Sequence, residues 1–87
     1  MKNVDNLYLE LKPIILKSRR TILSLSKETH ASRVTLWRWS NNINTRYPDP
    51  YKLISVLGKI SGKKEPSDIA NHFGGEIKNY ILDYFKS

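Results

Sequence analysis

Hydrophobic residues at the start of the chain recur at intervals of three and four positions, the spacing of one face of an α-helix. That face is traced by Val4, Leu7, Leu11, Ile14 and Ile15. It predicts a first helix that starts from an N-cap at Asp5, bends at Pro13 and ends near Arg19. Two alternatives are open at this point. The leucines between positions 7 and 11 also alternate as in a strand, and Pro13 is equally suited to the first turn of a shorter helix.

Two shorter helical patterns follow, and a hydroxyl residue precedes each of them. Thr21 is predicted to cap the first of these helices and Ser32 the second. Only a few residues around His30 are available to join them. The apolar positions predicted to face the core of the protein are Ile22, Leu25, Leu36 and Trp39.

A loop and a longer helix come next. Residues 41 to 49 are rich in Asn and Pro, which is typical of a loop. Asp49 followed by Pro50 supplies an N-cap and a first-turn proline, and Gly62 is a suitable end. The predicted fourth helix buries Leu53, Ile54, Val56, Leu57 and Ile60.

The rest of the chain is also helical in pattern. Ser67 is predicted to cap a fifth helix, which carries Ile69, Ala70 and Phe73 inward and ends at the Gly74-Gly75 pair. From Glu76 a last helix shows the apolar face Ile77, Tyr80, Ile81, Tyr84 and Phe85. The pattern as a whole predicts a single all-α domain over residues 1–87, compact and built from five to six helices.

The composition of the chain limits the classes of function that it can have. A chain of 87 residues buries roughly 60–65% of its unfolded surface, too little to build a deep substrate cavity, so a binding protein is favoured over an enzyme. There is no cysteine and there are two histidines, which excludes disulfide scaffolds, thiolate catalysis and the usual zinc ligand sets. We expect no catalytic residue, no cofactor, no metal and no small-molecule pocket. Neither a membrane-spanning run nor a signal-peptide pattern is present, so we expect a cytoplasmic protein.

The positive charge is concentrated in one segment. Fifteen Lys and Arg against eight Asp and Glu give a net charge of +7. Between positions 12 and 46 lie eight bases, all the arginines among them, and a single acid, Glu28, so this segment carries the whole excess. Elsewhere seven bases balance seven acids. Such a distribution favours a nucleic-acid partner, with a solvated basic surface as the alternative.

The same segment contains a recognisable motif. From Thr21 to Asn42 a short helix, a tight turn and a second helix follow one another, which is helix-turn-helix geometry. These residues resemble the phage Cro and repressor (XRE-like) family of helix-turn-helix DNA-binding regulators. The resemblance covers about residues 12 to 61. It rests on Thr21, Leu25, Ser26, Ser32, Arg33, Leu36, Trp39, Asn41 and Pro48, and on the apolar positions between 53 and 60.

Several positions depart from the family pattern. The turn has His30 where the family usually has Gly, and His30 can still adopt a left-handed conformation, though at some cost. Ile22 replaces a Gln that can bind DNA in the family. The usual Glu after Trp39 is Ser40, and the usual Gly after Asn41 is Asn42. These departures leave the framework intact but make the family's detailed contacts less transferable.

The resemblance implies a recognition helix at about Ser32–Asn41 in the major groove of double-stranded DNA. By position, Arg33, Val34 and Arg38 resemble the family's base-contacting residues. Residues implied or expected at the sugar-phosphate backbone are Lys17, Arg19, Arg20, Thr21, Lys27, Ser32, Thr35, Trp37, Asn41 and Arg46. Arg46 is placed to reach a phosphate or the minor groove, and packing against the following loop is the alternative for Trp37.

The last helix raises the question of a partner. The aromatic and aliphatic face formed by Ile77, Tyr80, Ile81, Tyr84 and Phe85 is predicted to mediate a homodimer, since two recognition helices read a near-palindromic site. In the alternative, the last two helices fold back and complete a monomer.

The sequence therefore predicts a transcriptional regulator, bacterial or phage-encoded and associated with the nucleoid. Two alternatives involve a protein partner bound through the C-terminal helices: an antitoxin-like protein and a DNA-processing accessory factor. A membrane-surface role is disfavoured, because the bases do not line one long amphipathic helix.

Overall fold

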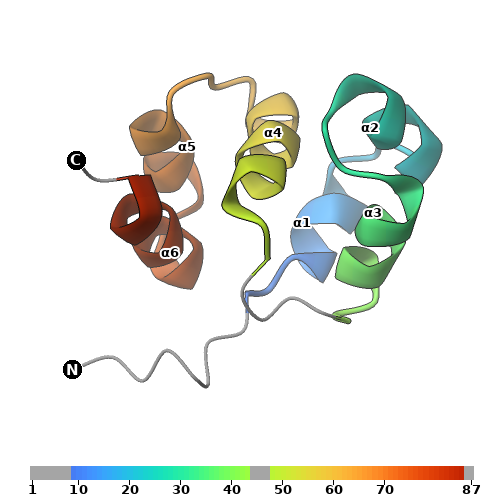
Figure 1. The fold of residues 1–87 in the computed structure, drawn as a ribbon, viewed down its shortest axis with the longest axis horizontal. Coiled ribbons are helices and arrows are strands. Elements are labelled where there is room, and N and C mark those ends of the chain that lie inside the picture. The colour runs from blue at the N-terminus through green and yellow to red at the C-terminus, as the bar shows by residue number, and fades with distance from the viewer. Residues whose placement is uncertain (1–8, 44–47, 86–87) are drawn as a thin grey trace.

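Residues 9–43 and 48–85 are described in the computed structural model of this protein. This part of the chain forms six helices and contains no strand (Figure 1). They are α1 (Lys12–Lys17), α2 (Ile22–Glu28), α3 (Arg33–Ser40), α4 (Pro50–Ser61), α5 (Pro66–Phe73) and α6 (Gly75–Phe85). The predicted all-α class is confirmed.

Short-range signals determine where several helices begin and end. Thr21 Oγ1 accepts a hydrogen bond from the Ser24 N–H (3.0 Å) and caps α2. Asp49 caps α4 by accepting from the backbone N–H groups of residues 51 and 52, and Pro50 follows in the first turn. Gly62 ends α4 with a φ of 77°, a left-handed conformation that glycine adopts without steric cost. These predictions are confirmed.

The first helix is shorter than predicted. The proposed cap at Asp5 lies outside the described residues, but residues 9 and 10 are not helical and α1 begins at Lys12. Pro13 therefore lies in the first turn and causes no bend, because proline lacks an N–H and clashes with the preceding turn anywhere deeper in a helix. The helix ends at Lys17, and Arg19 adopts a left-handed φ of 61° before α2 starts.

The cap predicted for α5 is also wrong. Ser67 lies inside the helix, whose N-cap position is Glu65, and no side chain of the N-cap residue closes the first turn. Pro66 takes the first helical position instead. Its fixed φ suits that position and its missing N–H would have had no partner there, so the helix can start without a hydroxyl cap.

A single hydrophobic core joins the helices. Its largest members include Leu25, Leu36, Leu53 and Ile69, each at most 1% exposed. Trp39, predicted to be in the core, is 3% exposed. The helices α1, α2 and α3 pack together at one end of the molecule, and α4 lies between them and the α5–α6 pair (Figure 1). This arrangement leaves one side of α3 without a helix packed against it.

Candidate nucleic-acid interface

The turn between α2 and α3 positions the candidate interface. Thr29 leaves α2 in an extended conformation (φ −133°, ψ 178°), and its hydroxyl donates to the Leu25 carbonyl (2.6 Å). The backbone N–H of His30 donates to Ser55 Oγ on α4 (3.0 Å). Ala31 is buried against the core. The turn is therefore attached both to α2 and to α4.

His30 does not adopt the left-handed conformation that the family's glycine would allow. Among the described non-glycine residues, positive φ angles occur at Arg19 and Asn42. Because Thr29 is extended, the chain reverses without a left-handed residue in this turn, and the family's glycine is not needed here. The turn geometry thus departs from the pattern that the resemblance implies.

A helix is present where the sequence predicts one at Ser32–Asn41: α3 has these two residues as its caps. Its buried face consists of Leu36 and Trp39. Since successive residues turn by about 100°, the opposite face carries Val34 and Trp37, which are 57% and 53% exposed. Such exposure of two large apolar side chains on a short helix marks a surface suited to contact.

The three predicted base-contacting residues all lie on this exposed side. Arg33 and Arg38 are exposed at the two ends of the face, with Val34 beside Arg33. Neither arginine forms a salt bridge with any carboxylate of the described residues. Both guanidinium groups are therefore available to an external acceptor, and a planar guanidinium can bind the O6 and N7 atoms of guanine together.

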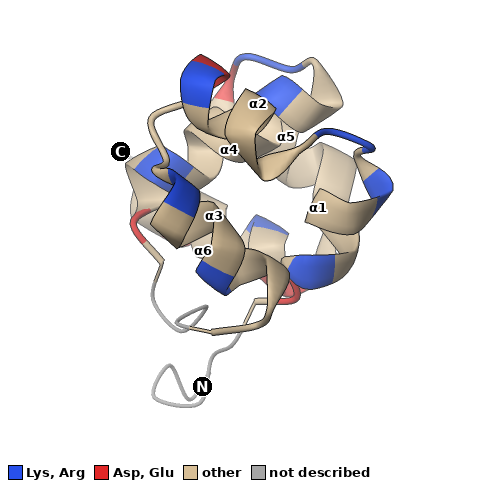
Figure 2. Cartoon of the chain, turned by 90° about the vertical axis from the view of Figure 1, so that its right-hand side faces the viewer, with Lys and Arg blue, Asp and Glu red and all other residues tan. Residues whose placement is uncertain are grey.

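Three of the predicted phosphate contacts lie on α1, on α2 and between these two helices. Lys17, Arg19 and Lys27 are exposed and have no salt bridge within the described part of the chain. In Figure 2, which views this side of the molecule, Lys and Arg segments lie on α1, α2 and α3. Another of the predicted contacts, Arg46, lies outside the described residues.

The polar residues predicted at the DNA backbone are already used within the helices. Ser32 Oγ accepts from the Thr35 N–H (3.2 Å) and donates to Thr35 Oγ1 (3.1 Å). Asn41 Nδ2 donates to the Trp37 carbonyl (2.9 Å) at the end of α3. Thr21, as described above, caps α2. The first role of these groups is thus to close helix ends, and any contact to DNA uses their remaining hydrogen-bonding capacity.

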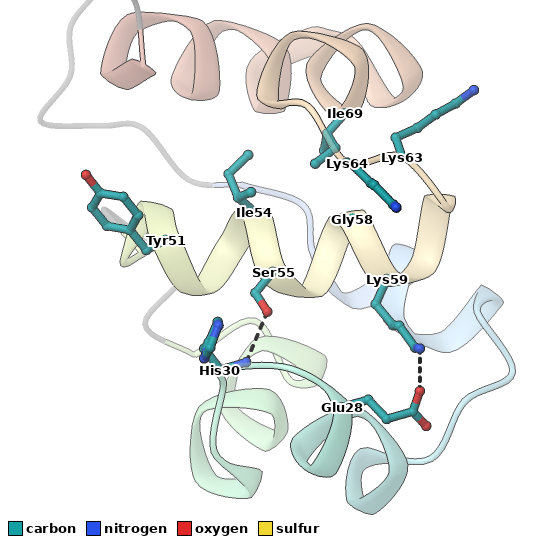
Figure 3. Close-up of a pocket in the computed structure, with 10 residues that line it drawn as sticks. All are labelled: Glu28, His30, Tyr51, Ile54, Ser55, Gly58, Lys59, Lys63, Lys64 and Ile69. Atoms are coloured by element: carbon teal, nitrogen blue, oxygen red, sulfur yellow. Dashed lines mark hydrogen bonds and ion pairs between the residues drawn. The ribbon is translucent and has the colours of Figure 1, made fainter.

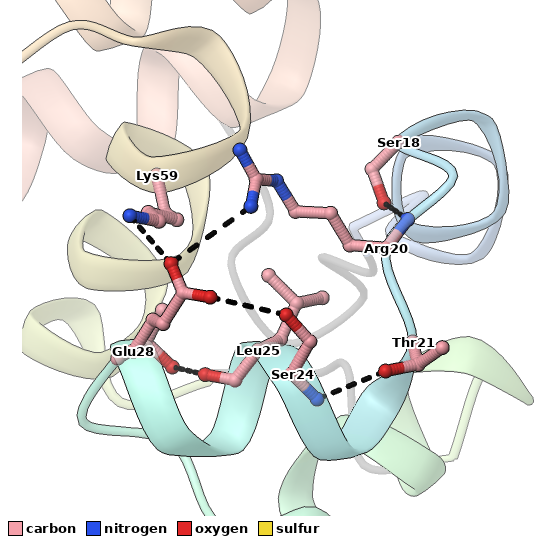
Figure 4. A network of polar contacts seen from close by, with 8 residues as sticks. Ser18, Arg20, Thr21, Ser24, Leu25, Glu28 and Lys59 are labelled. Carbon is pink, nitrogen blue, oxygen red and sulfur yellow. Dashed lines mark hydrogen bonds and ion pairs between the residues drawn. The ribbon is translucent and has the colours of Figure 1, made fainter.

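Glu28 is the centre of a polar network that the sequence did not predict (Figure 4). Its carboxylate lies 2.6 Å from Lys59 Nζ, 3.1 Å from Ser24 Oγ and 3.9 Å from Arg20 Nη1. The hydrogen bond from Lys59 lowers the pKa of Glu28 below its ordinary value, and Ser24 and the nearby positive charges act in the same direction. Lys59 is 31 positions away, so no local pattern indicates the pairing. Arg20 is consequently shared between Glu28 and any external phosphate.

The predicted dimerisation face needs correction. Ile77 and Ile81 are 7% and 0% exposed and belong to the core of the chain itself. The Tyr80 hydroxyl donates to the Pro48 carbonyl, and Phe85 is half-buried against the core. Only Tyr84, at 52%, is well exposed. Ile77 and Ile81 therefore help to close the chain's own core, where α6 packs against α4 and α5.

The apolar surface that remains exposed near α6 is an aromatic cluster. Tyr51, at the start of α4 and 64% exposed, makes edge-to-face contacts with Tyr84 (5.8 Å between ring centroids) and Phe85 (5.4 Å). Leu82 is 36% exposed on the same helix as Tyr84. Tyr51 was not singled out from the sequence, because its partners lie more than 30 positions further on.

Two further observations concern membranes and metals. No helix in the described ranges is long and apolar enough to cross a bilayer. The same residues hold no group of three His, Asp or Glu side chains that could bind a metal ion.

No protein-family model matches this chain, and no match to it is found among curated proteins or solved structures. Its function must be inferred from its own residues and their geometry.

Proposed function

We propose that this protein is a sequence-specific DNA-binding transcriptional regulator that inserts α3 into the major groove. One observation carries the proposal: α3 turns Arg33, Val34 and Arg38 outward, within the segment that holds the whole net charge of +7. The major groove accepts one α-helix, and the two arginines match guanine while Val34 matches a thymine methyl group.

The surrounding residues support the same orientation. Lys17, Arg19 and Lys27 lie on α1, on α2 and between these helices. They have no carboxylate partner among the described residues, so they are free to neutralise phosphates. In this proposal Arg20 contributes less than these three, because Glu28 competes for it. Trp37 packs on the sugar-phosphate backbone, and Arg46 follows in the loop after α3.

Membership of the Cro and repressor type remains part of the proposal. The order of α2 and α3, their hydroxyl caps and the buried Leu36 and Trp39 favour it. The extended turn at Thr29 differs from the family's usual turn. In this role the protein acts in the cytoplasm on nucleoid DNA, as a homodimer on a near-palindromic site.

Selection of bound sequences from a random pool of duplex DNA tests the proposal. We expect enrichment of a short motif that contains guanine, and a mobility-shift titration should show at least a 100-fold preference for it over random DNA at physiological salt. A pool that enriches no motif, together with equal affinity for all duplexes, would refute sequence-specific regulation.

A protein partner is the second candidate, and the aromatic cluster of Tyr51, Tyr84 and Phe85 favours it. An antitoxin-like or DNA-processing accessory protein would use this surface for its partner. Co-purification of a stoichiometric partner that is lost in a Tyr84→Ser variant would support this role. Retention of that partner by the variant would place its binding site elsewhere.

A further inference from the structure

A groove runs along α4 on the side away from the core (Figure 3). Its floor is the stripe formed by Tyr51, Ile54, Ser55, Gly58 and Lys59, which recur at helical spacing. One wall is the α2–α3 turn, and the other is the start of α5 with the loop before it. The groove measures about 470 Å³ and is largely open to solvent.

Close packing at Gly58 shapes the second wall. A side chain there would lie 3.0 Å from the Lys63 carbonyl oxygen and 3.3 Å from Ile69 Cδ1. The missing side chain therefore lets the α4–α5 loop approach the helix closely. As a result Lys63 and Lys64 are held beside the floor of the groove.

The charge of the groove is positive. Lys59, Lys63 and Lys64 line it together with one carboxylate, Glu28. Lys63 and Lys64 are exposed, and neither has a salt bridge within the described ranges. Two cationic groups at this end therefore lack an anionic partner.

Glu28 determines which lysines of the groove remain unpaired. Its carboxylate accepts a hydrogen bond from Lys59 Nζ at 2.6 Å, and its pKa is lowered by that contact. Lys59 is therefore already paired with a carboxylate. Lys63 and Lys64 have no such partner within the described ranges, so they are the cations of the groove that a ligand phosphate would meet.

The other end of the groove is aromatic. Tyr51 and His30 both line it, and Tyr51 is supported from the side by Tyr84 and Phe85. Between the rings and the lysines, Ser55 Oγ accepts from the His30 N–H, which leaves its own hydrogen to donate. From Tyr51 to Lys59 the helix rises about 12 Å.

We propose that this groove is a binding site for a nucleoside phosphate, with the base against Tyr51 and His30 and the phosphates against Lys63 and Lys64. The basic end, the aromatic end and the length between them match the two parts of such a ligand. The site is separate from the exposed face of α3, and its occupancy does not depend on the proposed DNA binding.

Calorimetric titration of the full chain with ATP tests this site, with inorganic triphosphate and adenosine as the separate halves of the ligand. We expect ATP to bind more tightly than triphosphate by about fivefold or more, since stacking on an aromatic ring adds affinity, and adenosine to bind too weakly to measure. A Lys63→Gln/Lys64→Gln variant should bind ATP at least tenfold more weakly. The matched control Lys52→Gln/Lys78→Gln removes the same charge outside the groove and should change the affinity less than twofold.

Variant Tyr51→Leu separates the two ends. It should reduce ATP affinity about fivefold and leave triphosphate affinity unchanged, while circular dichroism confirms that both groove variants are folded. Amide NMR shifts on ATP addition should map to α4, His30 and the loop before α5. Shifts confined to α1–α3, equal losses in the control variant, or groove shifts caused by duplex DNA but not by ATP would each overturn the proposal.

Discussion

Arg38 and Lys17 carry the same charge but differ in where they lie and in what they can recognise. Arg38 is on the exposed face of α3, whereas Lys17 ends α1 beside it. Arg38→Ala should therefore cost about 1–3 kcal/mol on the preferred DNA sequence and relax the base preference at one position. Lys17→Ala should weaken all sequences alike and reduce the dependence of log affinity on log salt by about one. Fluorescence anisotropy titrations at several salt concentrations measure both effects.

These two variants serve as controls for each other, because each removes one positive charge from the same end of the molecule. The decisive quantity is the ratio of affinities for the selected site and for a scrambled site. If Lys17→Ala lowers this ratio as much as Arg38→Ala does, α3 is not the element that reads the bases.

Glu28 makes a pH-dependent contribution to stability. Because the pKa of Glu28 is lowered in the folded chain, its carboxylate stabilises the fold at pH values above the ordinary carboxyl pKa of 4.5. This contribution to stability is lost as the pH falls through the pKa of Glu28 in the folded chain. Glu28→Gln should therefore lower the midpoint of thermal unfolding at pH 7. At about pH 3 the difference in melting midpoint between variant and wild type should be smaller than at pH 7. Circular dichroism melts at the two pH values give the comparison.

Glu10→Gln is the matched control for that experiment, because Glu10 is exposed and makes no salt bridge within the described residues. It should leave the melting midpoint nearly unchanged at pH 7. If the difference in melting midpoint between Glu28→Gln and wild type grows toward acid pH, the lowered pKa of Glu28 and the role of Lys59 are contradicted.

At the scale of helices, two serines of similar sequence context have different roles. Ser32 caps α3, whereas Ser67 lies within α5 and caps nothing. Ser32→Ala should lower the free energy of unfolding by about 1 kcal/mol. Ser67→Ala should leave it unchanged or raise it by a few tenths of a kcal/mol, because alanine is the better helix former. Urea denaturation measures the free energy of unfolding of both variants. An equal loss of stability in the two variants would indicate that Ser67 also caps its helix.

Signals contained within one turn of helix were predictable from the sequence. Thr21, Ser32 and Asp49 act on N–H groups two or three residues away, so the residue type alone indicates the cap. Proline at the start of a helix was harder to interpret. Both Pro13 and Pro66 open a helix, but the predicted caps were Asp5, eight positions before Pro13, and Ser67, directly after Pro66.

The outward face of α3 was predictable for a related reason. Once Leu36 and Trp39 are assigned to the core, the helical period places Arg33, Val34 and Arg38 on the outside. The contacts that hold α3 in position were not predictable. The His30 N–H donates to Ser55, which is 25 positions further along the chain. The ion pair between Lys59 and Glu28 and the groove along α4 likewise form only when α4 lies beside α2 in the folded chain.

Across the whole molecule, the basic helices and the exposed residues of α6 lie toward different ends of the longest axis, while exposed apolar side chains occur at both ends (Figure 1). The basic helices α1, α2 and α3 are at one end, and α6, with its exposed Tyr84 and Leu82, is near the other (Figure 1). The molecule is 38 Å long in this direction. The position of any dimer interface therefore controls how far apart two copies of α3 can be.

A dimer joined at the α6 end predicts an unusual operator. With two copies end to end, the two α3 helices lie at most about 76 Å apart, twice the 38 Å extent. Two turns of DNA measure about 68–72 Å, so the half-sites should be about 20–21 base pairs apart, centre to centre, instead of one turn. The selected sequences report this spacing directly, and light scattering should give twice the chain mass of 10.1 kDa.

The surface that makes this dimer can be tested without DNA. Replacing Leu82 and Tyr84 by Ser removes exposed apolar area and leaves the buried Ile77 and Ile81 in place, so the fold should persist while the mass falls to that of one chain. On DNA the variant should protect one half-site at low concentration and lose the preference for paired sites. Half-sites one turn apart would move the interface to the α1–α3 end. A wild-type mass of about 10 kDa at tens of micromolar would exclude a dimer in the absence of DNA. If the selected sequences still contain two half-sites, the two copies then associate only on DNA.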